Sequence, residues 1–122
     1  MATDDYHRRR IGSYYTPDWM ARWMVSRVLP DGFADLRASF TILDPACGDG
    51  AFVLPLLDRI ASQRRVADDD AISRLQIVRD HVYGVDSDAE AIHHVRRRVS
   101  EWIGDLSEAT SEIERVVSCN FP

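Results

Sequence analysis

The sequence predicts a small α/β domain in which short parallel strands alternate with helices. Two apolar segments rich in β-branched residues, 40–43 and 81–85, are each followed by a carboxylate. Residues with helical spacing precede and follow both segments, which is the pattern of strands joined by helical crossovers. The segment 113–122 also reads as a strand, so we expect about three parallel strands in all.

The length and composition indicate one soluble domain. Residues 1–12 are polar and look loosely attached to a folded unit over 13–122. No apolar run approaches the roughly 20 residues of a membrane span, and no apolar core of a signal peptide follows the start. Cys47 and Cys119 are too few for a disulfide framework or a multi-cysteine zinc site. We expect reduced thiols in a cytoplasmic protein.

Charge argues against a domain that holds nucleic acid by itself. The net charge is −5, and all fifteen basic residues are arginines. Some of them cluster at 8–10, 64–65 and 96–98, where they would either contact phosphates or form solvated helix faces. Because acidic residues interleave with the clusters, we favour the solvated faces. The acidic run 68–70 is likewise read as a helix cap rather than a metal site, and we expect no metal.

Capping and turn residues bound the expected helices. Thr16 is a good N-cap and Pro17 suits the first turn of a helix that runs to about Leu29. Asp70 and Asp88 are expected to cap two later helices. The four helices are predicted over 17–29, 50–65, 71–80 and 88–104. The first has an apolar stripe, made by Trp19, Met20, Trp23, Met24 and Val28.

A glycine turn follows the first expected strand and opens a helix. Pro45 ends the strand after Asp44, and Gly48 and Gly50 let the backbone approach a ligand closely. The free N–H groups of the following helix would face whatever the turn holds. A third glycine of the dinucleotide fingerprint is absent, since Val53 stands there, and the chain has no lysine for a P-loop. A cofactor loop and an ordinary strand-to-helix turn both remain open on these grounds.

Residue identities in two segments add a resemblance. The segment 44–52, Asp-Pro-Ala-Cys-Gly-Asp-Gly-Ala-Phe, resembles the first cofactor motif of adenine-N6 DNA methyltransferases of restriction–modification systems, which use S-adenosylmethionine. Asp49 stands where that family usually has serine. The segment 12–17, Gly-Ser-Tyr-Tyr-Thr-Pro, is similar to the motif that precedes it in the same family. The resemblance implies a Rossmann-like methyltransferase fold, of which this chain holds a part.

The resemblance also implies a cofactor site. It implies that Thr16 contacts the methionine carboxylate of the cofactor and that Asp86 binds the ribose. An acid at the end of a second strand can also accept hydrogen bonds from ribose hydroxyls on general structural grounds. Ser87 stands where the family usually has an apolar residue against the adenine. Asn120 and Phe121 would be the pair that touches the adenine at the end of the third strand. The expected cofactor residues are Tyr15, Thr16, Asp44, Pro45, Ala46, Cys47, Gly48, Gly50, Asp86, Ser87, Asn120 and Phe121.

No catalytic residue can be assigned. The Asn/Asp-Pro-Pro-Tyr/Phe motif that the family uses for chemistry on the flipped base does not occur in these 122 residues. The resemblance therefore implies the S-adenosylmethionine-binding region of a DNA methyltransferase, inactive by itself. The alternative is a stand-alone methyltransferase-like binding or regulatory protein, including one in small-molecule metabolism. A dehydrogenase-type nucleotide-binding domain is disfavoured by the missing glycine.

The expected sheet predicts a partner. The family's strand order is 3-2-1-4-5, so the first strand of this chain would have a bare outer edge, and its residues 40–43 are mostly apolar. Such an edge pairs readily with another chain. We expect a dimer through strand addition or swapping, or a partner chain that supplies further strands, with DNA bound only as part of a larger assembly.

Overall fold

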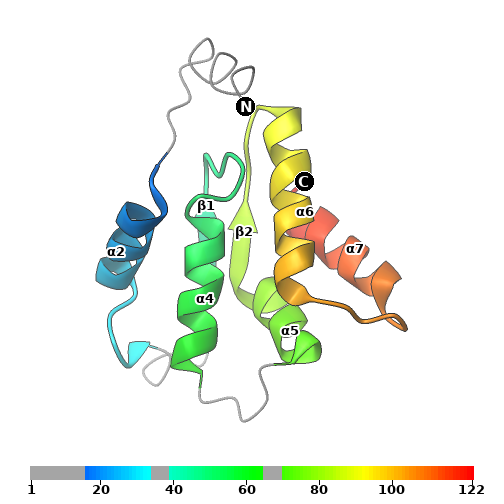
Figure 1. Cartoon of the computed structure of the whole chain (residues 1–122), viewed down its shortest axis with the longest axis horizontal. Coiled ribbons are helices and arrows are strands. Elements are labelled where there is room, and N and C mark those ends of the chain that lie inside the picture. Colours follow the sequence, from blue (N-terminus) through cyan, green and yellow to red (C-terminus); the bar gives the residue numbers. More distant parts are fainter. Residues whose placement is uncertain (1–15, 34–38, 65–69) are drawn as a thin grey trace.

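The computed structural model describes residues 16–33, 39–64 and 70–122. Figure 1 shows two central strands with helices around them. In chain order the elements are α2 (Asp18–Val28), β1 (Ile42–Asp44), α4 (Val53–Gln63), α5 (Ala71–His81), β2 (Val82–Gly84), α6 (Ala89–Ile103) and α7 (Thr110–Asn120). None of the described helices is long and apolar enough to span a membrane.

The two strands form a parallel pair. Ile42 lies opposite Val82, and Asp44 lies opposite Gly84. The connection between the strands contains α4 and α5, so the predicted α/β class with parallel strands is confirmed. Because the strands are parallel, their carboxyl ends lie at the same edge of the sheet, where the glycine turn and Asp86 also lie.

The expected third strand is wrong, because this segment forms α7. Ile113, Val116, Val117 and Asn120 are its buried residues. Their spacing of three, four and seven residues is helical, and this period outweighs the β-branched composition on which the strand prediction depended. α7 packs against α5, α6 and β2, and the described part of the chain has two strands rather than three.

The predicted helix ends are partly confirmed. Asp70 accepts a hydrogen bond from the Ser73 amide at 2.8 Å, and Asp88 accepts one from the Glu90 amide at 3.0 Å, so both caps are correct. Thr16 is not the N-cap of α2, because Pro17 occupies that position and no side chain caps this end. α4 begins at Val53 rather than near Gly50.

The core is one continuous cluster between the helices and the strands. Side chains of α4 enter it on one apolar face, α5, β2, α6 and α7 supply most of the rest, and Val25, Leu29 and Cys47 complete it. The most buried large residues are Leu57, Ile60, Ile77, Ile103 and Phe121. Together they hold β2 between the helices and set the position of its carboxyl end.

The apolar stripe of α2 lies largely outside this core. Ala21 and Val25 are buried on the side of α2 that packs against α4, whereas Trp19 is 69% exposed and Trp23 is 59% exposed. α2 lies on the side of β1 that is away from β2 (Figure 1). The helix that has these exposed apolar side chains is therefore next to the edge of β1 that has no strand partner among the described residues.

Candidate cofactor site

The candidate site lies where both strands end. Beyond the strands, Val85 donates its amide to the Asp44 carbonyl at 3.0 Å, and Cys47 donates to the Val85 carbonyl at 2.9 Å. These two hydrogen bonds continue the ladder and bring the glycine turn against the segment that follows β2. The start of α2, with Thr16 just before it, lies at the same end of the molecule (Figure 1).

The turn uses its two glycines differently. Gly50 has a φ of 101°, and a Cβ there would lie 2.8 Å from the Leu54 side chain and 3.1 Å from that of Val95. Gly50 is therefore favoured both by the backbone conformation and by the close packing of side chains from α4 and α6. Gly48 has a φ of 54°, but a Cβ there would meet no atom of the described residues within 4 Å. Among the described residues, the backbone at Gly48 is consequently open.

Asp86 joins the two halves of the site. Its Oδ2 accepts a hydrogen bond from the Gly48 amide at 2.9 Å, and its Oδ1 accepts one from the Asp88 amide at 2.8 Å. Two predicted site residues that are 38 positions apart are thus in direct contact. Each carboxylate oxygen has further lone pairs, so Asp86 can still accept hydrogen bonds from a ligand.

Asp44 carries a spare acceptor. Its Oδ1 accepts from the Ala46 amide at 3.1 Å, whereas its Oδ2 is buried and has no hydrogen-bond partner in the described part of the chain. Buried polar atoms in folded proteins are nearly always paired, so an orphan of this kind marks a position where a ligand donor fits. Asp44 therefore suits an ammonium or hydroxyl group of a bound molecule.

Cys47 is a packing residue of the turn. Only 3% of it is exposed, and its Sγ lies 3.7 Å from the Gly48 carbonyl. Burial, with Asp44, Asp86 and Asp49 nearby, raises the pKa of the Cys47 thiol from 9.0 to about 11. The thiol is therefore neutral near pH 7 and is not an activated nucleophile.

The remaining predicted residues of the two motifs differ in their placement. Pro45 and Ala46 are exposed in the turn, and Ser87 is exposed directly after Asp86. Thr16 is partly buried before α2. Tyr15 lies outside the described residues. The structure thus brings together the first-motif residues and Asp86.

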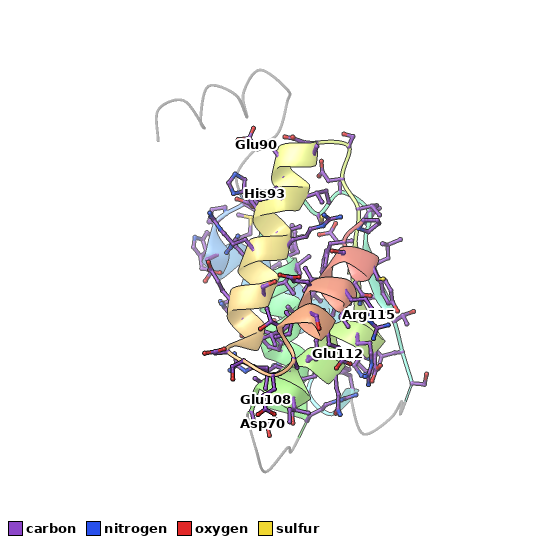
Figure 2. All side chains as sticks on the ribbon, turned by 90° about the vertical axis from the view of Figure 1, so that its right-hand side faces the viewer. Asp70, Glu90, His93, Glu108, Glu112 and Arg115 are labelled. Carbon is purple, nitrogen blue, oxygen red and sulfur yellow. The ribbon has the colours of Figure 1, made fainter. Side chains whose placement is uncertain are left out.

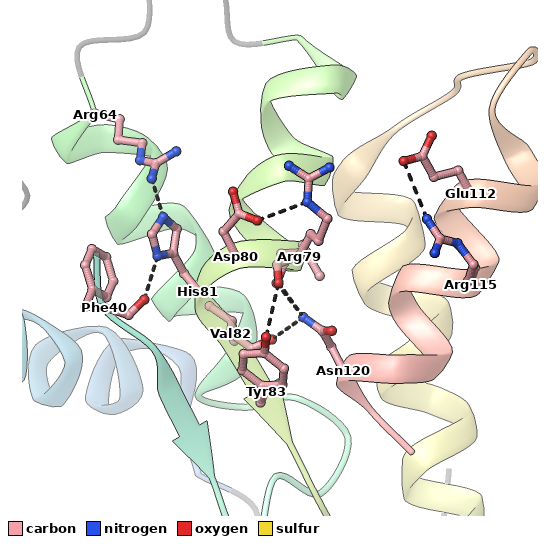
Figure 3. A network of polar contacts seen from close by, with 11 residues as sticks. Phe40, Arg64, Arg79, Asp80, His81, Val82, Tyr83, Glu112, Arg115 and Asn120 are labelled. Atoms are coloured by element: carbon pink, nitrogen blue, oxygen red, sulfur yellow. Dashed lines mark hydrogen bonds and ion pairs between the residues drawn. The ribbon is translucent and has the colours of Figure 1, made fainter. Parts of the chain in front are cut away.

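Asn120 and Phe121 lie at the end of a helix rather than a strand. The Asn120 side chain is buried and donates to the carbonyls of Val78 at 2.6 Å and Val82 at 3.0 Å, where it links α5 to β2 (Figure 3). Phe121 is fully buried, and its ring fills the space over Gly84. The prediction that these two residues touch an adenine depended on a third strand that ends at them. Because the segment is a helix, the contact stays a prediction that lacks this structural basis.

The arginines of α6 were not expected to reach the site. Arg98 donates from Nη1 to the Asp49 carbonyl at 2.9 Å, and Arg96 donates from Nε to the Phe121 carbonyl at 2.6 Å. The expectation that these arginines lie on a solvated helix face is therefore correct for Arg97, which is exposed, but not for Arg96 and Arg98. A signal existed in the spacing, because Arg98 lies between Val95 and Val99 and so borders the apolar face of α6.

The two histidines of α6, His93 and His94, lie at or near the surface. Figure 2 shows His93 and Glu90 on the outer side of the first turns of α6, and His93 is exposed. His94 lies 3.9 Å from Glu90 across one helical turn. No group of three metal-ligating side chains occurs in the part of the chain that the structure describes.

Comparison with known proteins identifies the family. No solved structure shows a significant match to the chain. The family model of N-6 DNA methylase matches residues 4–96, a range that contains both the Tyr-Tyr-Thr-Pro segment and the glycine turn and extends past Asp86. More than half of the sequence is matched, and the chain therefore belongs to the N-6 DNA methylase family.

Proposed function

We propose that this chain is the S-adenosylmethionine-binding region of a site-specific DNA adenine-N6 methyltransferase. Family membership supports the substrate class. The observation that carries the proposal is the contact between Asp86 Oδ2 and the Gly48 amide at 2.9 Å, because it joins the strand-end acid to the glycine turn. An open turn beside a strand-end carboxylate is the arrangement that binds a nucleoside.

The residues present fit the cofactor. Asp86 would accept hydrogen bonds from the ribose hydroxyls through its remaining lone pairs. The buried and unpaired Asp44 Oδ2 would accept from the ammonium of the methionine part. The bound cofactor supplies the methyl group for transfer. Since the Asn/Asp-Pro-Pro-Tyr/Phe motif is absent from the sequence, we propose that these 122 residues bind the cofactor but do not transfer its methyl group alone.

Calorimetric titration with S-adenosylmethionine tests this function. We expect the wild-type chain to bind, and Asp86→Ala to weaken binding by about 1.5–3 kcal/mol, as for hydrogen bonds to a charged group. Asp80→Ala is the matched control, because Asp80 is a partly exposed carboxylate near the opposite end of β2. Absence of heat and of a thermal shift at millimolar cofactor would contradict the proposal and favour the alternative of a stand-alone methyltransferase-like binding or regulatory protein.

We further propose that the isolated chain self-associates through the bare edge of β1. In the described sheet β1 pairs only with β2, and Leu43 is 57% exposed. An unpaired strand edge is self-complementary, because its N–H and C=O groups can pair in antiparallel fashion with the same edge of a second copy. α2, which has two exposed tryptophans, lies on the same side of β1 and would extend the interface.

Light scattering over a wide concentration range tests self-association. We expect a dimer that Leu43→Lys shifts toward monomer, because a lysine on the edge disfavours strand pairing. Ile72→Lys is the matched control, since Ile72 is similarly exposed but lies on α5. A monomer at all concentrations would overturn this proposal, and a monomer that associates only with a chain carrying additional strands would replace it with hetero-assembly.

A further inference from the structure

The glycine turn is held from outside at two points, and both holding side chains come from the segment after β2. Asp86 accepts from the Gly48 amide, as described above. One residue further along the turn, Arg98 of α6 donates to the Asp49 carbonyl at 2.9 Å. The turn therefore has a side-chain hydrogen bond at an amide and another at the carbonyl of the next residue.

The Arg98 contact fixes one peptide group at both of its ends. The Asp49 carbonyl belongs to the same planar unit as the Gly50 amide, and in a trans peptide the two point in opposite directions. The Gly50 amide donates to the Cys47 carbonyl at 3.0 Å. The guanidinium therefore prevents this peptide from rotating, although the φ of Gly50 is one that glycine reaches freely.

Arg98 also supplies positive charge beside an acidic turn. Its Nη1 lies 3.8 Å from Asp49 Oδ1. Asp44, Asp49 and Asp86 are close enough together that all three raise the pKa of Cys47. Their mutual repulsion would open the turn, and a guanidinium against Asp49 reduces it. Both roles of Arg98 act on the conformation of the turn rather than on the fold of α6.

We propose that Arg98 is a positioning residue that holds the turn 48–50 in the conformation that receives the cofactor. The part that concerns the cofactor rests on the proposed function. The part that concerns the turn does not, since the contacts exist without any ligand. The two parts are measured separately.

Amide hydrogen exchange without cofactor tests the turn. In Arg98→Ala we expect the Gly50 amide to exchange about tenfold faster, because local opening follows the loss of a hydrogen bond to a charged group. Arg98→Lys should restore part of the protection, since an ammonium can still donate to the carbonyl. Arg97→Ala is the matched control, because Arg97 pairs with Glu101 on the exposed face. Unchanged exchange at Gly50 in Arg98→Ala overturns the proposal.

Titration with S-adenosylmethionine tests the consequence for binding. We expect about tenfold weaker binding by Arg98→Ala, partial recovery by Arg98→Lys, and wild-type affinity for Arg97→Ala. Equal urea midpoints for the variants would show that the fold is retained. If Arg98→Ala exchanges faster at Gly50 but binds the cofactor with unchanged affinity, the proposal that Arg98 prepares the turn for the cofactor is overturned. If the wild type does not bind while Arg98→Ala still exchanges faster, the proposed function fails and the positioning of the turn stands.

Discussion

The two ends of the β1–β2 sheet have buried polar groups with opposite hydrogen-bonding states. At the amino end, each described buried side-chain polar group has a partner. At the carboxyl end, one carboxylate oxygen is buried without one. The two-stranded sheet thus separates a network of paired polar groups at its amino end from a buried carboxylate oxygen at its carboxyl end that has no partner among the described residues.

The amino end is held by His81 and Asn120 (Figure 3). His81 Nδ1 lies 2.8 Å from the Phe40 carbonyl, its Nε2 contacts Arg64, and its ring stacks on that of Phe40 with the centroids 4.2 Å apart. Since a guanidinium only donates, Nε2 accepts and Nδ1 carries the proton that the Phe40 carbonyl accepts. This network ties α4 and α5 to the segment that leads into β1.

The carboxyl end has a different arrangement. Among the described residues, Asp44 Oδ2 has no hydrogen-bond partner and the backbone at Gly48 is open, while Asp86 has unused lone pairs. Buried polar groups are paired at the end that completes the fold, and one is left unpaired at the end where we propose that the cofactor binds. The difference therefore supports placing the function at this end.

Asn120→Ala gives the largest expected effect and tests the amino end. The substitution removes the donor shared by the Val78 and Val82 carbonyls and leaves a small cavity in a site where Asn120 is 5% exposed. We expect the free energy of unfolding to fall by about 3 kcal/mol, measured by urea denaturation. Ser118→Ala, at an exposed position of the same helix, should change it by less than about 0.5 kcal/mol. A loss below about 1 kcal/mol for Asn120→Ala would show that the amino end is not held as described.

Sequence reasoning succeeded where the signal was local. The glycine turn, the caps at Asp70 and Asp88 and the two strands each depend on a few consecutive residues, and all are present. It failed at α7, because the β-branched residues there were weighed by composition rather than by their spacing.

Contacts between distant segments could not be predicted in the same way. The Asn120 hydrogen bonds join positions about 40 residues apart, and the Arg98 contact spans 49 positions. Such contacts depend on how the helices pack. Spacing indicates that Arg98 borders the apolar face of α6, but a single sequence does not specify which group the side chain contacts. The exposure of the apolar stripe of α2 has the same origin, since spacing shows that a face is apolar but not what covers it.

The reactivity of the two cysteines tests the carboxyl end of the sheet, with a smaller expected effect on stability. Cys47 is buried with a pKa raised to about 11, whereas Cys119 is exposed on α7. A pKa two units above 9.0 lowers the thiolate fraction near pH 8 by about a hundredfold. We expect iodoacetamide to modify Cys119 first, with Cys47 at least about a hundredfold slower, as followed by mass spectrometry with Cys119→Ser as the control.

The pH dependence of Cys47 has a definite sign. Because the folded pKa lies above the ordinary value, the neutral thiol favours the folded state, and this contribution is complete below pH 9 and is lost as the pH rises toward 11. Alkylation of Cys47 in the folded chain should accordingly rise about tenfold per pH unit between 8 and 10. In Asp86→Ala one of the carboxylates that raise this pKa is removed, so the rise should begin at lower pH. Equal modification of both cysteines at pH 8 would mean that the turn opens freely, and that the carboxyl end is loose rather than organised to bind.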